Sequence, residues 1–250
     1  MITSSRNNRV AAAKKLRRTR VRRQMGNTLV EGPFLLEEAA AAAAQIQEVF
    51  ALEEDAATAR ICKEQGCSLL RVTPQVMGAL ASSVNPRGPV AVVSIPETPP
   101  LEPRDSVVLW DIADPGNAGT IIRTAGAFGF QVIATAGCVD LWSPKVIRSG
   151  VGGHFRAPPI VDLDPDPGVL IASGLTPLVA AAGASAPADE VVGIPVPVAL
   201  IIGNEAHGVP GRVVDTPGVN VFSLPMPGGA ESLNAAVAAG IAMYLRMNAR

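Results

Sequence analysis

The residues of this 250-residue chain that could do chemistry follow three short hydrophobic segments. After the first comes DPGNAGTIIRTAGAFG, which holds one amide, Asn117, and one cation, Arg123. The second, PVALII, runs straight into Gly203-Asn204-Glu205, and the third leads to LPMPGGAESLN, which ends on Ser232 and Asn234. Amides, hydroxyls, a carboxylate and a guanidinium are groups that orient a substrate and stabilise developing negative charge.

Some of these residues also have a purely structural interpretation. Arg123 lies among apolar helix residues, so its guanidinium either meets an anion at a cleft or extends to solvent. Ser232 either acts in a site or caps the final helix. Gly203 permits close approach of the backbone to a ligand. His207 lies past a strand end in a predicted surface turn, which disfavours it as a catalytic base.

The elements that must position these groups alternate between strands and helices. The sequence predicts strands at 106–113, 131–137, 175–183, 197–205 and 220–226, with helices at 118–128, 144–150 and 231–247 between and after them. In the last helix an apolar residue recurs at every fourth position. This spacing predicts a buried stripe of Leu233, Val237, Ile241 and Leu245. This alternation indicates an α/β fold with a mainly parallel sheet and helices on both faces. Ligands in such folds bind beyond the carboxyl ends of the strands.

A smaller α/β unit precedes this region. Residues 28–30 predict a strand, and the alanine-rich run after Gly32-Pro33 predicts a helix. A second helix ending near Gly66, a strand at 68–72, a third helix from Thr73 and a strand at 89–95 complete it. The sequence thus divides into a basic arm at 1–25, a small domain at 26–95, a proline-rich linker at 96–105 and a second domain at 106–250.

Charge is distributed unevenly along the chain. The net charge is −1, but residues 1–25 contain nine basic side chains and no acidic one, which leaves about −10 for the remainder. A basic arm on an acidic body favours a polyanionic partner such as nucleic acid, on which the arm could become helical. The alternative is a solvated leader.

Composition excludes several classes of protein. The longest apolar runs are too short to span a bilayer, and the basic N-terminus has no apolar stretch of a secretory signal. Cys62, Cys67 and Cys138 match no metal-binding spacing, so we expect reduced thiols in a cytoplasmic protein without a metal. Gly116 and Gly119 lack the third glycine of a dinucleotide fingerprint, which disfavours a nicotinamide-dependent oxidoreductase.

The three polar segments together resemble the three signature motifs of the SpoU/TrmH family of RNA ribose 2′-O-methyltransferases, in the SPOUT superfamily. The motifs are DPGNAGTIIRTAGAFG, LIIGNEAHGVP and LPMPGGAESLNAAVAAGIAMYL, in that order, with SPKVIRSGVGGHFRAP as the linking segment. The resemblance covers Ser106 to Arg250. The N-terminal part resembles the L30e-like substrate-binding domain often fused to such enzymes. The chain departs from the family at Ala235 and Ala236, where a Val-Ser pair is usual.

The resemblance implies a homodimer with a deep trefoil knot that binds S-adenosylmethionine in a bent shape. The implied cofactor-binding residues are Val179, Ala180, Gly203, Leu224, Met226 and Leu233. The implied catalytic residues are Asn117, Arg123, Glu205, Ser232 and Asn234.

The implied reaction is in-line attack of a ribose 2′-hydroxyl on the sulfonium methyl. Arginine stays cationic in proteins, so Arg123 is expected to bind a phosphate and stabilise the developing alkoxide rather than to take the proton. Asn117 and Glu205 are expected to orient Arg123 or the ribose. The substrate favoured by the L30e-like domain is 23S ribosomal RNA. Transfer RNA is an alternative, and so is a catalytically silent RNA-binding or ribosome-assembly protein.

Overall fold

The computed structural model describes residues 1–53, 55–83, 86, 88–161, 166–181, 184, 186 and 193–249. Its chain divides into two compact units, each made of two segments. Unit 1 comprises Met1–Glu97 and Trp142–Arg156, and unit 2 comprises Thr98–Leu141 and Ala157–Arg250. Within the described ranges, no helix is long and apolar enough to cross a membrane.

Unit 1 is built on a four-stranded sheet in the order β1-β4-β2-β3. β4 is antiparallel to both β1 and β2, whereas β2 and β3 are parallel. The strands are β1 (Asn27–Glu31), β2 (Ile46–Ala51), β3 (Ser68–Arg71) and β4 (Val90–Ser94). The helices are α1 (Asn8–Lys15), α2 (Thr19–Met25), α3 (Pro33–Ala41), α4 (Ala56–Gln65), α5 (Pro74–Leu80), α7 (Pro144–Ser149) and α8 (Gly153–Arg156).

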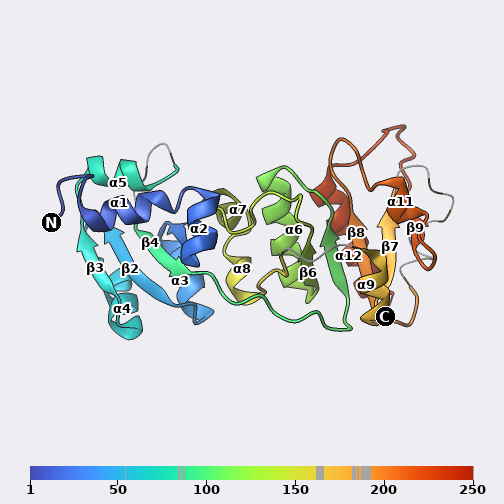
Figure 1. Ribbon diagram of the computed structural model, residues 1–250, viewed down its shortest axis with the longest axis horizontal. Coiled ribbons are helices and arrows are strands. Elements are labelled where there is room, and N and C mark those ends of the chain that lie inside the picture. The colour runs from blue at the N-terminus through green and yellow to red at the C-terminus, as the bar shows by residue number, and fades with distance from the viewer. Residues whose placement is uncertain are drawn as a thin grey trace. The chain divides into compact units, whose positions relative to one another are not determined.

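Both faces of this sheet are covered, so successive strand residues enter different cores. Leu29 packs with α1 and α5 on one face, and Val30 packs with α3 and α4 on the other. Figure 1 shows α1 and α5 on one side of these strands and α3 and α4 on the opposite side. Side chains alternate between the two faces along each strand, because the pleat points neighbouring side chains in opposite directions.

The first 25 residues are part of this unit, in contrast to the separate basic arm that the sequence predicts. Val10, Ala13 and Leu16 are buried in the core that includes α5. Arg22 is also buried, and its guanidinium donates to the Leu16 carbonyl at 2.7 Å and to the Thr19 hydroxyl at 3.0 Å. The three apolar residues, at helical spacing among the many cations, fold the segment back onto the sheet.

Strand β2 lies where the sequence analysis expected only a helix. The alanine-rich helix α3 stops at Ala41, and Ala43 adopts a left-handed conformation with φ of 55°. The following residues pair with β4 on one side and β3 on the other, and they bury Val49 and Phe50 on opposite faces. Pairing on both edges and burial on both faces override the helix propensity of the preceding alanines.

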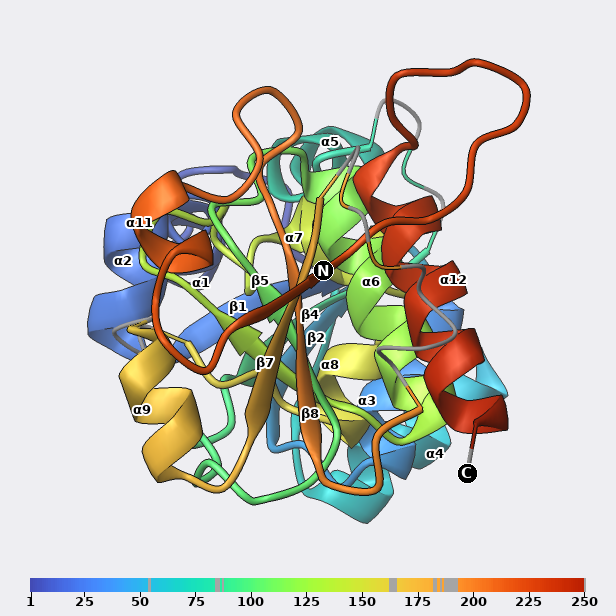
Figure 2. The ribbon, with the colours of Figure 1, turned by 90° about the vertical axis from the view of Figure 1, so that its right-hand side faces the viewer.

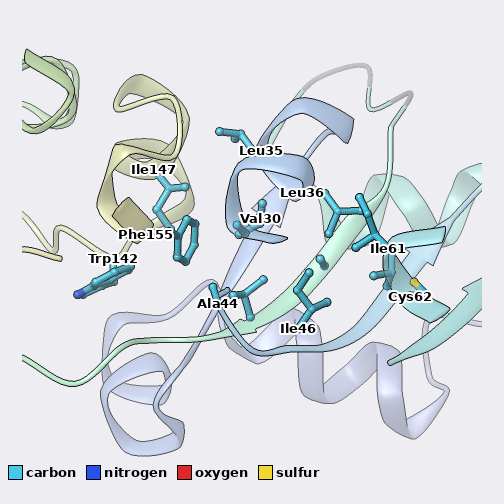
Figure 3. Packing of buried hydrophobic residues seen from close by; sticks show 14 residues of the cluster. Val30, Leu35, Leu36, Ala44, Ile46, Ile61, Cys62, Trp142, Ile147 and Phe155 are labelled. Carbon is cyan, nitrogen blue, oxygen red and sulfur yellow. The ribbon is translucent and has the colours of Figure 1, made fainter. Parts of the chain in front are cut away.

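Residues 142–156 belong to unit 1, although the sequence places them within a continuous second domain. Trp142, Ile147 and Phe155 belong to the core that includes α3, and Figure 3 shows them beside that helix. The Thr28 hydroxyl on β1 donates to the Trp142 carbonyl at 2.6 Å. Large apolar side chains on a short segment must be buried somewhere, and here they complete the core of the first unit.

Unit 2 is built on a five-stranded, wholly parallel sheet in the order β6-β5-β8-β7-β9. Figure 2 shows α6 and α12 on one side of the sheet and α9 and α11 on the other. The predicted α/β class with a parallel sheet is therefore confirmed. The strands are β5 (Ser106–Leu109), β6 (Gln131–Ala134), β7 (Thr176–Ala180), β8 (Val198–Ile202) and β9 (Asn220–Phe222). The helices are α6 (Pro115–Phe128), α9 (Pro167–Ala172), α11 (Gly211–Val214) and α12 (Ala235–Asn248).

The predicted buried stripe on the last helix is wrong. Val237 is 50% exposed and Ile241 is 39% exposed, and Leu233, which precedes the helix, is 38% exposed. The residues that α12 buries are Ala235, Ala236, Ala239, Ala242, Met243 and Arg246. Small alanines let α12 lie close against α6 and the sheet, so the bulkier aliphatic side chains face outwards.

A buried ion pair fixes the end of α12. The Arg246 guanidinium, 1% exposed, donates to both carboxylate oxygens of Asp105, at 2.8 Å and 3.1 Å. Asp105 also accepts from the backbone N–H of Val198, the first residue of β8. Because the pair is bidentate and carries a further hydrogen bond, it holds the last helix against the sheet with fixed geometry.

Candidate active site

The polar segments converge at the carboxyl ends of β5 and β8, which are neighbours in the unit 2 sheet. Glu205 lies three residues beyond β8, and Asn117 lies in the first turn of α6, just beyond β5. The Asn204 side chain donates to the Asp111 carbonyl at 2.7 Å and so ties the two strand ends together. This is the edge at which open parallel sheets bind ligands.

The start of α6 fixes the position of Asn117. Asp114 is the N-cap, and its carboxylate accepts from the Asn117 backbone N–H at 2.8 Å. Pro115 occupies the first helical position, where its fixed φ suits the helix and its missing N–H costs nothing. Asn117 is thus a buried residue of the first helical turn.

Glu205 accepts three hydrogen bonds from the segment that opens α6. The donors are the backbone N–H groups of Ala113 at 3.1 Å and Asp114 at 3.2 Å, and the Asn117 amide at 2.8 Å. Partial burial raises the pKa of Glu205, but the hydrogen bonds from Asn117 and the backbone outweigh it, so the pKa lies below its usual value. Glu205 is therefore an ionised acceptor at neutral pH.

Asn234 connects the start of α12 to the same group. Its side-chain oxygen caps the helix by accepting from Ala236 N–H at 3.0 Å and Val237 N–H at 3.2 Å. Its side-chain N–H donates to the Asn117 amide oxygen at 2.8 Å. Asn234, Asn117 and Glu205 thus form a continuous chain of hydrogen bonds, which we call the polar bridge. The N-cap of α12 is Asn234, not Ser232.

A cavity of about 680 Å³ adjoins the polar bridge. All six residues predicted to bind a cofactor line it, and so do three of the predicted catalytic residues, Glu205, Ser232 and Asn234. Asn117 lies behind this wall and hydrogen-bonds to two of its members. The lining residues are Val179, Ala180, Ala181, Ile202, Gly203, Asn204, Glu205, Ala206, Gly208, Val209, Val214, Leu224, Met226, Glu231, Ser232, Leu233, Asn234, Ala235 and Ala238.

Gly203 shapes the cavity wall by admitting the backbone of its own chain. A Cβ atom there would lie 2.4 Å from the Gly208 carbonyl carbon and 2.6 Å from the Val209 nitrogen. The turn between them is closed by backbone hydrogen bonds between Asn204 and Gly208 at 2.9 Å and 3.2 Å. From the sequence we expect this glycine to admit a ligand, whereas in the structure its missing side chain admits the backbone of residues 208 and 209.

Arg123 is not brought to the cavity within one chain. It lies on the exposed face of α6, and no hydrogen bond or ion pair reaches its guanidinium from the described part of the molecule. Its neighbour Thr124 lies against Gly240 of α12. His207 is exposed outside the cavity lining, and its backbone N–H donates to the Asn204 side chain at 3.1 Å.

Sequence reasoning missed two residues of the site. Asn204 organises the turn after β8, because its side-chain oxygen accepts from Ala206 and His207 while its N–H reaches the segment after β5. Glu231 adds a second carboxylate to the cavity wall. An asparagine that follows a glycine at the end of a buried strand is a typical turn former, so Asn204 could have been found from the sequence. Nothing in the local pattern distinguished Glu231.

The cavity suits a ligand that joins an apolar group to a cation. Ile202, Val209 and Leu224 offer apolar surface, whereas Glu205 and Glu231 are carboxylates. S-adenosylmethionine has this chemistry, since it combines an adenine ring with a sulfonium and an ammonium group. The volume also falls in the range of about 300–1,000 Å³ that is typical of small-molecule sites.

Two family models match the chain. Residues 105–244 match the SpoU rRNA Methylase family, and residues 7–91 match the MRM3-like substrate binding domain. The first match covers more than half of the chain and includes the whole polar bridge and the whole cavity lining.

Several relatives match nearly the whole chain. The chain is 31% identical to the 23S rRNA (guanosine(2553)-2′-O)-methyltransferase RlmP of Bacillus subtilis, over 97% of each chain. It is 33% identical to an uncharacterized tRNA/rRNA methyltransferase of Synechocystis sp., over 97% of this chain and 92% of that one. The crystal structure of an AdoMet-bound rRNA methyltransferase from Sinorhizobium meliloti superposes with a TM-score of 0.87 at 26% identity, over 99% and 97% of the two chains.

Proposed function

The chain belongs to the SpoU rRNA methylase family, and we propose that it methylates a ribose 2′-hydroxyl of ribosomal RNA. It is an S-adenosylmethionine-dependent RNA methyltransferase. The observation that carries the proposal is the polar bridge on the wall of the cavity. It sets an anion and two amides beside a cavity large enough for a small ligand.

S-adenosylmethionine would lie in the cavity between the strand ends and the segment that precedes α12. Val179 and Ala180 would line the adenine side. The residues that would contact the cofactor largely through backbone groups are Gly203, Leu224, Met226 and Leu233. When bound, the cofactor supplies a methyl group already activated by positive sulfur. The protein must then align the hydroxyl with that methyl, and a well-oriented pair of reactants reacts far faster than a free pair.

Glu205 would act as a fixed anion that orients other groups. Its lowered pKa makes it a weak proton acceptor, and its oxygens already accept three hydrogen bonds. Asn117, held by Glu205, accepts a hydrogen bond from the Asn234 side chain and so fixes the position of Asn234 at the cavity wall. Ser232, exposed on the same wall, would hydrogen-bond the incoming sugar.

Arg123 would stabilise the alkoxide that develops on the ribose and bind a neighbouring phosphate. Guanidinium groups are permanently charged and bind phosphate with two parallel hydrogen bonds. Because Arg123 points to solvent in a single chain, this role requires RNA or a second subunit to bring the guanidinium to the reacting groups.

We propose that the enzyme acts as a homodimer that pairs through the outer face of α12. Val237, Ile241, Tyr244 and Met247 are all exposed on this helix, at 50%, 39%, 54% and 42%. Contiguous exposed apolar side chains of this kind mark interaction surfaces. A dimer through this face would bury the stripe and would enclose the region around Arg123.

The trefoil knot expected from the family belongs to the same proposal. The chain passes from the edge strand β9 back to α12, which packs on the opposite half of the sheet beside α6 (Figure 2). We expect the segment between them, residues 223–234, to be the threaded part.

The favoured substrate is 23S ribosomal RNA. The supporting relative is the Bacillus subtilis enzyme, which matches this chain over nearly its full length and is named for that RNA. Transfer RNA is the second candidate, because a structure described for 2′-OH methylation of C/U34 on tRNA matches 59% of this chain at 28% identity. We place the reaction in the cytoplasm, where free thiols such as those of Cys62 and Cys67 stay reduced.

Methyl transfer from radiolabelled S-adenosylmethionine tests the proposal directly. RNA from cells that lack this protein would be the substrate, and ribose methylation would be mapped in RNA from cells with and without it. We expect the enzyme to label one ribose of 23S RNA in vitro. The same ribose should be methylated in RNA from cells with the protein and unmethylated in RNA from cells without it. Label on a base, on transfer RNA alone or on no RNA would contradict the proposal.

A further inference from the structure

The two units carry opposite charge. Unit 1 has 16 basic and 9 acidic side chains, a net charge of +7, whereas unit 2 has 5 basic and 13 acidic side chains, a net charge of −8. Nine of the 16 cations of unit 1 lie within residues 1–25, where there is no acidic residue. The positive charge of unit 1 is therefore concentrated in its first 25 residues, which contain α1 and α2.

The nine cations of residues 1–25 differ in their contacts within the described part of the fold. Arg22 is buried and holds the turn together through Leu16 and Thr19. Arg9 pairs with Glu48 of β2 at 3.4 Å. The other exposed cations include Lys14, Lys15, Arg17, Arg18 and Arg20, which we call the basic ridge. No ion pair links these five side chains to any described residue.

Helix stability accounts for only part of the basic ridge. Cations favour the C-terminal end of a helix, so Lys14 and Lys15 in the last turn of α1 are well placed. Arg18 and Arg20, however, stand at the N-terminal end of α2, where the helix dipole disfavours positive charge. Arg18 is the N-cap and makes no capping hydrogen bond. A sequence selected only for folding would place serine, aspartate or asparagine there.

The ridge is held in place before any partner arrives. Val10, Ala13 and Leu16 anchor α1 in the core, and the buried Arg22 anchors the turn. A basic segment that is already ordered binds phosphate without first losing the conformational entropy of a disordered tail.

We propose that the basic ridge is the phosphate-binding surface through which unit 1 holds the RNA substrate, independently of RNA sequence. This inference rests on the proposed function and adds to it where the RNA backbone lies and what the contact contributes. Lysine and arginine ammonium and guanidinium groups without internal partners bind backbone phosphates, which are identical at every nucleotide. The ridge therefore supplies affinity, and the choice of nucleotide must be made elsewhere.

Two variants with the same change in charge test the inference. The ridge variant is Lys14→Gln/Lys15→Gln/Arg17→Gln/Arg18→Gln. The control variant is Arg60→Gln/Lys63→Gln/Arg71→Gln/Lys145→Gln, which removes four exposed cations from other parts of unit 1. Binding of a 23S rRNA fragment and of an unrelated RNA of equal length would be measured across a series of KCl concentrations, with melting temperatures to verify folding.

The ridge variant should bind both RNAs about tenfold or more weakly at low salt and by the same factor. Its plot of log Kd against log salt should be shallower by about 0.7–0.9 for each phosphate that the variant no longer neutralises. The control variant should stay close to the natural protein. Equal losses in the two variants, or a loss confined to one RNA, would overturn the inference. Binding of both variants to phosphatidylserine vesicles would be measured in parallel. A ridge variant that keeps its RNA affinity but loses vesicle binding would also overturn the inference, because it would assign the ridge to a membrane surface.

Different results would contradict the role of the basic ridge and the proposed methyltransferase function. If the natural protein methylates 23S rRNA but the ridge variant keeps full RNA affinity and an unchanged salt slope, only the ridge is wrong. If the natural protein transfers no methyl group to any RNA, the proposed function itself fails.

Discussion

The side-chain amide of Asn234 donates to the amide oxygen of Asn117 at 2.8 Å across 117 residues of sequence. Because Asn117 donates in turn to Glu205, its amide has one orientation that satisfies both neighbours. The start of α6, the turn after β8 and the start of α12 are thereby fixed relative to each other. The site is complete only when all three segments are in place.

Asn234 has two roles that substitutions can separate. Asn234→Ala should lose the helix cap, at a cost of about 1 kcal/mol in the free energy of unfolding, and should also break the polar bridge. Asn234→Ser should keep the cap and lose only the amide that reaches Asn117. Both variants should lose about 100-fold in methyl transfer, because small misplacements cost that much. Assays and thermal melts check this, and a fully active Asn234→Ser enzyme would contradict it.

Glu205→Gln should remove a contribution to stability that depends on pH. The folded-state pKa of Glu205 lies below its usual value of 4.5. The ionised form therefore stabilises the fold above that value, and this stabilisation is lost as the pH falls through the folded-state pKa. The gap in melting temperature between the natural protein and the variant should be constant from about pH 8 to about pH 5 and should shrink below. A gap that widens on acidification would refute the assignment.

Arg123→Ala should leave the fold and the cofactor affinity unchanged and should abolish most methyl transfer. The side chain is exposed and makes no hydrogen bond or ion pair within the described chain, so the free energy of unfolding should change by less than about 0.5 kcal/mol. Loss of charge stabilisation should reduce kcat by about 100- to 1,000-fold. Calorimetric binding of S-adenosylmethionine with a parallel activity assay separates the two effects. Full activity in the variant would remove Arg123 from the mechanism.

Ile241→Asp should produce monomers if the outer face of α12 is the dimer interface. A carboxylate at the centre of an apolar contact must lose its hydration without a partner. The matched control is Val169→Asp on α9, which is similarly exposed, at 38%, on the other face of the sheet. Light scattering after gel filtration would measure the mass. A natural protein that is already monomeric, or a dimer that survives Ile241→Asp, would exclude this interface.

Asp105→Ala should destabilise unit 2 strongly. It removes the carboxylate that pairs with the buried Arg246, and breaking a buried pair costs about 3–5 kcal/mol. Glu102→Ala, which breaks an exposed pair with Arg104, should cost no more than about 1 kcal/mol. Chemical denaturation of both variants gives the comparison, and similar losses would show that burial is not the deciding factor.

Local patterns predicted most elements of unit 2 but not the outward face of α12. The fourfold repeat through Val237 and Ile241 correctly indicated an apolar helix face, and a single sequence cannot say what covers such a face. The alanines on the opposite side carry little hydrophobic signal, yet they are what α12 buries. The error in the predicted stripe and the proposal of a dimer thus have the same origin.

The site residues were predictable by type and strand position, but their connections were not. Asn117, Glu205 and Asn234 stood out because they follow buried strands or open helices. That Glu205 accepts from Asn117 rather than from Arg123 depends on the direction in which α6 leaves β5, which only the assembled sheet determines. For the same reason residues 142–156 could not be assigned to unit 1 from local sequence.

Neither unit is encoded as one uninterrupted stretch of the gene, because the chain crosses between them near residues 97, 141 and 156. A protease that cuts once after Glu97 would not release unit 1 whole, because residues 142–156 would stay covalently joined to unit 2 at both ends. A gene fragment starting at Thr98 would yield a protein that displays Trp142, Ile147 and Phe155 without the core they normally fill. Such a fragment should aggregate, so attempts to exchange the RNA-binding part between relatives must transplant both segments together.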